Sequence, residues 1–394
     1  MQIESIRLKN FKCFRDTEMK NIPRFCILVG ANGTGKSTLF NVFAFLREAF
    51  SSNIHTALVK HGGNRGFHEV RSRQVVGEIE IELKFRIKTG GPLVTYSLNI
   101  GEQNGNPVVS REILKYRRGS HGQPWHFLDF SKGSGFAVTN ELEQVTDVNL
   151  LNRENQQLKS PDILAIKGLA QFERFPAVKE LGNLIENWHV SEFHINRARP
   201  EQEAGHAEHL STEGENLSLV IQYLYTRHRH IFDEILGKLS KRIPGISRVD
   251  SKTTEEGRVL LRFQDHAFED PFLARYVSDG TIKMLAYLTL LFDPRPHPLL
   301  CVEEPENQLY PSLLEELAEE FRNYANRGGQ VFVSTHSPDF LNACAIDEVF
   351  WLVKQDGYTQ IHRAQENEQL VAYMDDGDKM GYLWKQGFFD GVEP

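Results

Sequence analysis

The stretch that most constrains this chain is the glycine-rich nonapeptide Gly30-Ala31-Asn32-Gly33-Thr34-Gly35-Lys36-Ser37-Thr38. An apolar run, Phe25–Val29, precedes it, and Leu39–Phe43, which we expect to begin a helix, follows it. The order strand, glycine loop, helix fits the phosphate-binding pattern G-x-x-x-x-G-K-[ST]. A chance glycine-rich turn is the alternative, and the flanking strand and helix argue against it.

The residue types in this stretch suit the binding of a nucleotide phosphate. Gly33 and Gly35 let the backbone turn where a side chain would clash, so that consecutive N–H groups point at the phosphate. The helix that begins near Lys36 adds its positive N-terminal end, and the lysine can reach the β- and γ-phosphates. The Ser37 hydroxyl can bind Mg²⁺. The predicted nucleotide-binding residues here are Asn32, Gly33, Gly35, Lys36, Ser37 and Thr38.

Length and composition indicate a soluble globular protein. The 394 residues have room for one large domain or two of ordinary size, and 40% are apolar and 25% charged. No apolar run is long enough to cross a bilayer, and the N-terminus lacks a signal-peptide core. The four cysteines are scattered and show no metal-ligand spacing, which is typical of a reduced compartment. We therefore expect a cytoplasmic protein with no membrane contact.

The formal net charge of −8 predicts no global attraction to nucleic acid. Locally, Gln222–Arg248 contains six lysines and arginines against two acidic residues, and a second basic stretch lies between Arg111 and Arg118. Such runs are commonly solvated helix faces, and they are also the composition of DNA or RNA contacts. Both interpretations remain open from the sequence.

Hydrophobic patterning predicts an α/β protein. An N-terminal antiparallel β part is expected from strands at Ile3–Leu8, Gly77–Phe85 and Val94–Ile100, the last two forming a hairpin. From about Gly101 to Lys159 the pattern weakens, and we expect an irregular insertion. The last third alternates expected helices with fully apolar strands, which predicts a mostly parallel central sheet covered on both faces. Its elements are expected at Thr281–Phe292, Pro298–Val302, Ser312–Ala325 and Gln330–Ser334.

A second motif for nucleotide chemistry is the apolar run Leu299–Val302 followed by Glu303 and Glu304. A buried strand that ends in two carboxylates is what hydrolysis requires beside a phosphate loop. The first acid can hold Mg²⁺, directly or through water, and the second can orient or deprotonate the attacking water. Alternatively these acids begin a helix, where negative charge is favourable. The presence of the nonapeptide favours the catalytic interpretation.

Two further motifs are candidates for phosphate contact. His336 follows the apolar strand Gln330–Ser334, at the edge where open α/β sheets bind ligands, and it could donate a hydrogen bond to the γ-phosphate. Ser278 and Gly280 precede an apolar helix, where a hydroxyl and backbone N–H groups can form a second anion site. A simple helix cap is the alternative for that pair.

In this order the four motifs resemble the ABC-type ATPase head, in the branch that contains RecF, SMC and OLD proteins. The likeness is greatest to bacterial stand-alone AAA-family ATPases, and it covers the first hundred residues and everything from about Ser191 onward. The segments Glu215-Asn216-Leu217 and Glu304–Pro311 support this resemblance.

The resemblance implies a P-loop fold and assigns roles to the motifs. Lys36 and Ser37 belong to Walker A, and Glu303 and Glu304 to Walker B, with the second acid catalytic. Ser278 to Gly280 match the signature motif, Asn307 to Leu309 the D-loop, and His336 the switch histidine. The chain is then divided into an N-terminal lobe with Walker A (1–100), an insertion or lid (101–190) and a C-terminal lobe (191–394).

Three positions depart from the family pattern or are not fixed by it. Glu303 stands where ABC proteins at large usually carry Asp, a change common in this branch. Tyr310 stands where relatives often have His, so its role is open. Gln74, after Arg71 and Arg73, is a candidate for the Q-loop glutamine.

In heads of this kind the signature motif of one subunit closes over ATP bound to Walker A of the other. The resemblance therefore implies ATP and Mg²⁺ as cofactors and a homodimer or higher oligomer that closes and reopens with hydrolysis. No heptad pattern predicts an SMC-like arm, and we expect no Toprim domain because the segment after His336 is too short for one.

Two functions of different class remain open from the sequence. One is an ATP-driven sensor or motor that responds to DNA, such as the ATPase subunit of an anti-phage defence system. The other is a regulatory scaffold in which ATP occupancy holds or releases a protein effector, a separate nuclease or toxin.

Overall fold

A six-stranded sheet lies at the centre of the computed structural model, which describes residues 1–88, 90–118, 122–141 and 147–389. The strand order is β10-β15-β16-β3-β17-β18, and every neighbouring pair is parallel except β17 and β18. This confirms the predicted α/β class with a mostly parallel central sheet. The strands span His189–Ser191, Leu299–Glu303, Gln330–Thr335, Phe25–Val29, Val349–Gln355 and Tyr358–Arg363.

The central strands are apolar throughout because both of their faces are covered. In β3, Cys26 and Leu28 pack into one core cluster together with helix α1 (Lys36–Ser51). Phe25, Ile27 and Val29 point the other way and join the cluster of α9 (Asp279–Leu291) and α10 (Leu314–Asn326). The phosphate loop therefore connects the centre of the sheet to a helix that covers one face of it.

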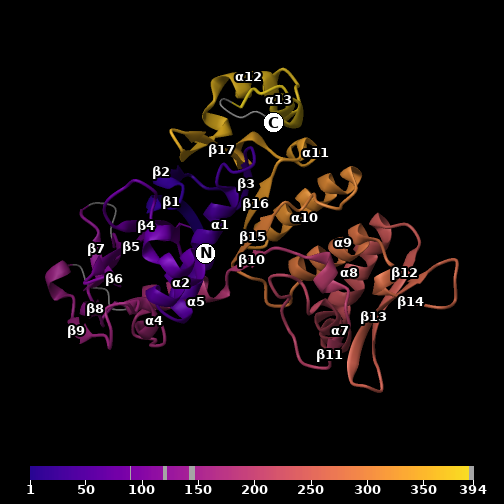
Figure 1. Cartoon of the computed structure of the whole chain (residues 1–394), viewed down its shortest axis with the longest axis horizontal. Coiled ribbons are helices and arrows are strands. Elements are labelled where there is room, and N and C mark those ends of the chain that lie inside the picture. The colour runs from indigo at the N-terminus through magenta and orange to yellow at the C-terminus, as the bar shows by residue number, and fades with distance from the viewer. Residues whose placement is uncertain (89, 119–121, 142–146, 390–394) are drawn as a thin grey trace.

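A second, antiparallel sheet lies in the indigo and magenta part of the molecule in Figure 1. Its strand order is β2-β1-β4-β5-β6-β7-β8-β9, and the predicted hairpin is the β4–β5 pair. The strands span Gln2–Phe11 (β1), Phe14–Lys20 (β2), Ile79–Arg86 (β4), Leu93–Gln103 (β5), Asn106–Tyr116 (β6), Trp125–Ser131 (β7), Ser134–Val138 (β8) and Arg153–Gln157 (β9). Strand β2 was not predicted.

The expectation of irregular chain from Gly101 to Lys159 was wrong for the described part of that segment, because β6 to β9 extend the sheet there. The residue types at two hairpin turns could have indicated these strands. Asn104 and Gly105 have φ of 53° and 77°, and Lys132 and Gly133 have φ of 51° and 83°. Pairs of residues with positive φ form the tight turns that match the twist of two-stranded hairpins. Residues 119–121 and 142–146 of this segment lie outside the described residues.

The remaining helices and short strands cover the two sheets or build the lobe drawn in rose and orange in Figure 1. That lobe contains α7 (Leu217–Arg227), α8 (Arg229–Arg242) and a hairpin of β12 (Ile246–Thr253) with β13 (Arg258–Asp265). The others are α2 (Ile54–Gly62), α3 (Phe67–Val70), α4 (Ala165–Leu169), α5 (Pro176–Asn187), α6 (Ile195–Ala198), β11 (Gln202–Glu203), β14 (Phe272–Leu273), α11 (Pro338–Leu341), α12 (Glu368–Asp375) and α13 (Met380–Lys385).

The division of the chain at residues 100 and 190 stays a prediction, although the pairing of β5 with β6 runs past residue 100 without interruption. Among the residues described, no helix has the length and apolar character needed to cross a bilayer.

Candidate active site

The phosphate loop connects the end of β3 at Val29 to the start of α1 at Lys36. Gly33 and Gly35 have φ of 79° and 107°, a region that residues with a side chain rarely adopt. A Cβ on Gly35 would lie 2.8 Å from Cys13 Sγ and 2.9 Å from Thr359 Oγ1. Glycine is therefore required here both by the turn and by the close approach of the neighbouring chain.

Strand β18 holds the loop in place. Thr359 Oγ1 donates a 2.6 Å hydrogen bond to the Thr34 carbonyl, and this contact is buried. The Thr359 N–H donates to the Cys13 carbonyl at 2.8 Å, which links the same strand to the β1–β2 turn. Contacts with residues more than 300 positions away thus pre-organise the loop. Because the loop is already ordered, ligand binding costs less conformational entropy.

Lys36 is buried and folds back over its own loop. Its Nζ donates to the carbonyls of Gly30 at 2.6 Å and Ala31 at 3.2 Å. Burial lowers the pKa of this amine, and the nearby carboxylates, Glu304 foremost, oppose the shift. The ammonium is therefore close to acidic groups but is hydrogen-bonded to neutral carbonyls, which phosphate oxygens can replace.

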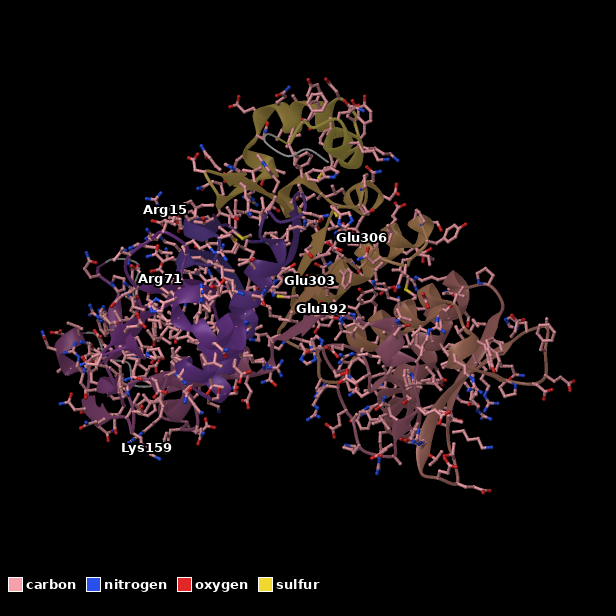
Figure 2. The ribbon with its side chains drawn as sticks, viewed as in Figure 1. Arg15, Arg71, Lys159, Glu192, Glu303 and Glu306 are labelled. Atoms are coloured by element: carbon pink, nitrogen blue, oxygen red, sulfur yellow. The ribbon has the colours of Figure 1, made fainter. Side chains whose placement is uncertain are left out.

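Ser37 and Glu303, the two predicted metal ligands, contact one another. Ser37 Oγ donates a 2.8 Å hydrogen bond to Glu303 Oε2 at the carboxyl end of β15. Burial raises the pKa of Glu303; the hydroxyl of Ser37 lowers it, while the charges of Glu192 and Glu304 raise it further. Glu192, Glu303 and Glu306 gather at the centre of the molecule in Figure 2. A hydroxyl and several carboxylates form the all-oxygen donor set that Mg²⁺ prefers, so the residues fit the ion.

Glu304 lies next to the loop in a strained backbone conformation. Its φ is 41°, which is uncommon for a residue other than glycine and is frequent at functional sites. The Glu304 N–H donates to the Ser334 carbonyl at 2.9 Å, and its Oε2 accepts from Asn307 Nδ2 at 2.9 Å. These contacts direct the carboxylate into the cleft, where it could orient a water molecule.

His336 and Glu306 complete the edge of the sheet. His336 Nδ1 is 3.4 Å from Glu304 Oε1, and the His336 N–H donates to Glu306 Oε1 at 3.0 Å. Thr335 Oγ1 donates to the same Glu306 oxygen at 2.7 Å. Glu306 therefore holds the loop after β15 against the end of β16, a positioning role that the sequence analysis did not assign.

Lys283 is a second residue that the sequence analysis missed. It is buried on α9, and its Nζ donates to the Asn307 carbonyl at 2.8 Å and approaches the Glu304 carbonyl at 3.5 Å. Burial lowers its pKa to about 8, and Glu306 and Glu304 act in the opposite direction. A lone lysine within the apolar helix Thr281–Phe292 was the available signal, because a buried lysine needs polar partners.

A cleft of about 640 Å³ lies over the phosphate loop. Its lining includes seven of the predicted site residues: Asn32, Gly33, Gly35, Lys36, Ser37, Thr38 and Glu304. It also includes four basic residues that the sequence analysis did not assign to the site: Lys12, Arg71, Arg73 and Lys354. Gln74 is exposed and does not line the cleft, although its neighbours Arg71 and Arg73 do. Basic side chains around the loop suit a ligand with several phosphate charges.

Ser278 and Gly280 lie outside this cleft, at the exposed start of α9. Ser278 Oγ accepts from the Thr281 N–H at 3.3 Å, so it caps the helix, as the simpler interpretation expected. Asp279, between these two residues, forms an ion pair with Arg199. Within one chain these residues therefore do not line the cleft that holds Lys36.

The basic run Gln222–Arg248 is largely paired with acids. Arg229 contacts Asp233, Arg248 contacts Asp250, and Lys238 contacts Glu320. Arg242 contacts Glu316 and Glu320 as well. Paired guanidinium and ammonium groups are less available to a phosphate backbone, so this geometry favours a solvated helix face.

Comparisons with known proteins agree with this geometry. Residues 25–342 match the family described as "AAA domain, putative AbiEii toxin, Type IV TA system". The DNA replication and repair protein RecF of Paenarthrobacter aurescens (strain TC1) is 30% identical over 117 residues. That match spans 29% of the chain and 27% of the relative, so it covers well under two thirds of the relative's length.

One of two solved structures compared with this chain has a similar fold. An SMC head bound to the C-terminal winged-helix domain of ScpA superposes with a TM-score of 0.54 at 15% identity, over 92% of this chain and 98% of that one. A Pyrococcus furiosus SMC head with an extended coiled coil, bound to the C-terminal domain of ScpA, gives a TM-score of 0.47 at 14% identity, over 95% and 99%.

Proposed function

This chain belongs to the AAA domain family and has an ABC-type ATPase head of the RecF and SMC kind, and on that premise we propose that it binds and hydrolyses ATP at the Lys36 cleft. The observation that carries the proposal is the 2.8 Å hydrogen bond between Ser37 and Glu303. It joins a hydroxyl at the phosphate loop to a carboxylate at the end of β15, a strand of the same central sheet. A hydroxyl and a carboxylate placed in this way are the donor pair that a nucleotide-bound Mg²⁺ requires.

Each side chain has a distinct task in this proposal. Lys36 and the loop N–H groups bind the phosphates, and Ser37 and Glu303 would hold Mg²⁺, which neutralises phosphate charge when bound. Glu304 orients the attacking water and accepts its proton, and His336 donates a hydrogen bond toward the γ-phosphate. Lys283 and Glu306 are positioning residues because they act through Glu304, Asn307 and His336.

We further propose that two copies of the chain share each nucleotide. Ser278 and Gly280 are at an accessible helix start but outside the cleft of their own chain, so they can contact a phosphate only across a subunit interface. ATP binding then favours a closed homodimer, and hydrolysis reopens it.

We propose two alternative processes to which this ATPase cycle is coupled. The RecF relative supports a DNA-related role, such as the sensor or motor subunit of an anti-phage defence system in the cytoplasm. The ion-paired basic run and the net charge of −8 weaken direct DNA contact. The alternative is an ATP-gated scaffold that holds a nuclease or toxin effector. Two comparisons support this alternative: the family is described as a putative toxin, and the SMC head of similar fold is bound to another protein.

Phosphate release by the purified full chain, with Mg²⁺ and ATP, tests the central proposal. Lys36→Ala should abolish turnover, and turnover equal to that of the unaltered chain would refute the assignment of the cleft. Duplex DNA distinguishes the two roles, because stimulation that weakens steeply with salt indicates a DNA-responsive motor. Turnover indifferent to DNA, together with a co-purifying protein partner, indicates the scaffold.

A further inference from the structure

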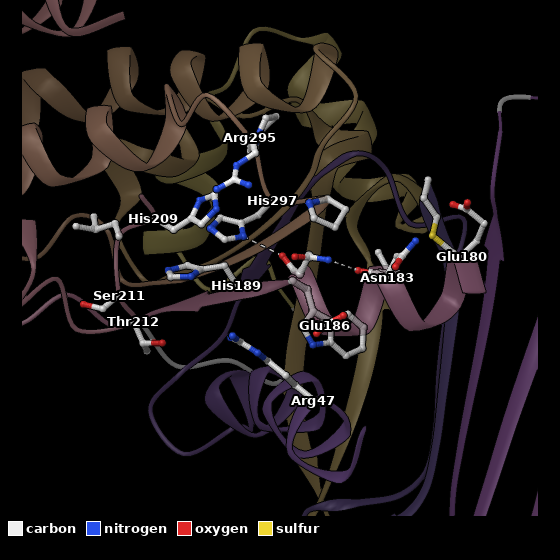
Figure 3. Close-up of a pocket in the computed structure, with 17 residues that line it drawn as sticks. Arg47, Glu180, Asn183, Glu186, His189, His209, Ser211, Thr212, Arg295 and His297 are labelled. Atoms are coloured by element: carbon white, nitrogen blue, oxygen red, sulfur yellow. Dashed lines mark hydrogen bonds between the residues drawn. The ribbon is translucent and has the colours of Figure 1, made fainter. Parts of the chain in front are cut away.

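A second site, away from the phosphate cleft, lies at the opposite edge of the central sheet. His189 is the first residue of β10, and His297 precedes β15, whereas Glu192 and Glu303 are at the carboxyl ends of the same two strands. A cleft of about 780 Å³ opens here, and Figure 3 shows His189, His209 and His297 grouped inside it. The nucleotide proposal uses none of these side chains.

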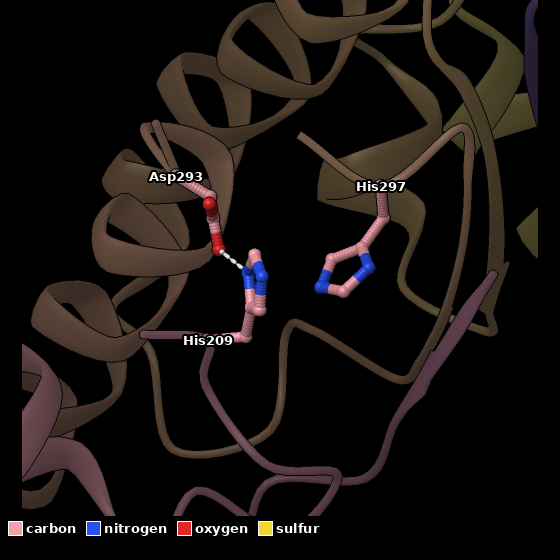
Figure 4. A group of neighbouring side chains, drawn as sticks. All are labelled: His209, Asp293 and His297. Atoms are coloured by element: carbon pink, nitrogen blue, oxygen red, sulfur yellow. Dashed lines mark hydrogen bonds and ion pairs between the residues drawn. The ribbon is translucent and has the colours of Figure 1, made fainter. Parts of the chain in front are cut away.

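The cluster is defined by His209, Asp293 and His297, together with His189. His209 comes from the loop of residues 204–216, and its Nδ1 lies 2.7 Å from Asp293 Oδ2. Asp293, just beyond the end of α9, exposes only 3% of its side chain. One ligand atom from each of His209, Asp293 and His297 lies within 4.8 Å of the other two, and Figure 4 shows the three side chains facing one another.

A hydrogen bond to the backbone determines which ring nitrogen of His297 carries the proton. Its Nδ1 is 2.9 Å from the Asn187 carbonyl, which can only accept, so Nδ1 carries the proton. The Nε2 atom therefore has a free lone pair, and it is buried with no hydrogen-bond partner among the described residues. A fixed tautomer with an outward-directed lone pair is the usual arrangement of a metal-binding histidine.

His189, which lies beside His297, also has an Nε2 that is unpaired among the described residues. The two rings stack with centroids 4.8 Å apart and an interplanar angle of 24°. His189 is 4% exposed, and its Nε2 also lacks a partner in the described chain. Leaving a buried polar atom unpaired is unfavourable and rare in folded proteins, so two such nitrogens in one cleft require an explanation.

We propose that this cluster is a divalent transition-metal site of the zinc type, with His209, Asp293 and His297 as ligands and His189 as the fourth donor. Imidazole nitrogens with one carboxylate match zinc, whereas Mg²⁺ and Ca²⁺ prefer oxygen ligands. Tetrahedral bonds of the usual length place ligand atoms about 3.3 Å apart. The ligand atoms of His209, Asp293 and His297 lie within 4.8 Å of one another, so side-chain rotation brings them to this spacing when the metal binds.

The surrounding charges are compatible with a cation. Arg295 lines the cleft, but it forms an ion pair with Glu208 of the His209 loop. Glu180 and Glu186 line the same cleft and offset the charge of Arg47. A bound metal would connect the loop of residues 204–216 to the chain between α9 and β15, so it should stabilise the fold without nucleotide.

Titration of the full chain with Zn²⁺, after EDTA treatment and without ATP or Mg²⁺, tests the site. One equivalent should bind, the melting temperature should rise, and Co²⁺ should give the visible bands of a four-coordinate site. Asp293→Asn and His297→Ala should each weaken zinc binding by at least about tenfold. His206→Ala is the matched control, because His206 is in the same loop with 70% of its side chain exposed.

Absence of stoichiometric zinc binding by the unaltered chain would overturn the proposal. Equal zinc affinity in all three variants would do the same, since it would assign the metal to surface histidines. If His297→Ala does not fold, as judged by circular dichroism, Asp293→Asn and the cobalt spectrum of the unaltered chain decide. Ser37→Ala should bind zinc normally, which separates this site from the nucleotide cleft.

Discussion

Ser37 and Glu303 are 266 positions apart in the chain, yet the Ser37 hydroxyl donates a 2.8 Å hydrogen bond to the Glu303 carboxylate. The contact arises because β3 and β15 both flank β16 and end at the same edge of the parallel sheet. One strand leads into the phosphate loop, and the other ends in the acidic pair. The sheet topology thus makes one oxygen-lined site from two distant motifs.

The first prediction concerns the donor pair itself. Ser37→Ala and Glu303→Gln each remove one oxygen ligand, so each should raise the Mg²⁺ concentration needed for half-maximal phosphate release and lower kcat. If each interaction contributes about 1.5–3 kcal/mol, the loss in kcat/KM is roughly 10- to 100-fold. Phosphate release is measured over a Mg²⁺ series at saturating ATP.

Ser51→Ala is the control for this experiment. Ser51 is on the same helix, α1, but at its far end, where its hydroxyl donates to the Glu48 carbonyl. It should leave the Mg²⁺ dependence unchanged. A Ser37→Ala curve that overlays the control would contradict the metal role of Ser37.

The second prediction concerns the shared nucleotide. Glu304→Gln keeps the size of the side chain but removes the carboxylate that accepts a proton, so hydrolysis should stop while ATP binding persists. The expected result is an ATP-dependent dimer that persists, seen by sedimentation velocity with Mg²⁺ and ATP. The unaltered chain should dimerise only transiently.

Adding Ser278→Arg to the Glu304→Gln variant provides the counter-test. The bulky side chain at the exposed start of α9 should block closure, so the double variant should sediment as a monomer with ATP. The gating proposal fails if sedimentation is the same with and without ATP in every variant.

The third prediction concerns Lys283, whose buried ammonium donates to the carbonyls of Asn307 and Glu304. Lys283→Met preserves length and removes both hydrogen bonds, so the loop that carries Glu304 should lose its fixed position. Turnover should fall about tenfold or more, since hydrogen bonds to charged groups are worth about 1.5–3 kcal/mol. Lys241→Met, on the exposed face of α8, is the control and should keep full turnover.

The site residues that could be predicted from the sequence are those whose chemistry lies within one short motif. Lys36, Ser37, Glu303 and Glu304 were found because each motif carries its chemistry within a few consecutive residues. Lys283 was missed because its role comes from tertiary contacts with a loop more than 20 positions away. The basic lining comes from Lys12, in the β1–β2 turn, and Lys354, near the end of β17, which no local pattern brings together.

The fold shows the same division. The apolar strands β3, β15 and β16 were predictable because burial on both faces leaves a continuous apolar run. Strands β7 to β9 are partly exposed and their apolar and polar residues alternate weakly, and β9 is polar throughout. The pairing that makes them strands is supplied by their neighbours, while the turn at Asn104-Gly105 was the local signal that could have indicated β6.

The antiparallel sheet also contains an acid with an altered pKa. Glu112, on β6, is fully buried, and its carboxyl oxygens accept from the N–H groups of Ala165 at 2.5 Å and Ile166 at 3.2 Å. Burial raises its pKa to about 7, although these N–H groups, and a hydrogen bond from Tyr96, act in the opposite direction. In the unfolded chain the same carboxyl group would titrate near 4.5.

The fourth prediction follows from that difference. Between pH 4.5 and 7 the folded state holds a proton that the unfolded state has released, so the free energy of unfolding falls as the pH rises through this window. The full loss, by pH 8, is about 3 kcal/mol.

Glu112→Gln cannot ionise, so its urea midpoint should depend less on pH between 5 and 8. The amide satisfies one N–H fewer, which costs about 1 kcal/mol at every pH. The variant should therefore be about as stable as the unaltered chain at pH 5 and more stable by about 2 kcal/mol at pH 8. Parallel pH profiles for the two proteins would show that Glu112 is ionised in the folded state throughout.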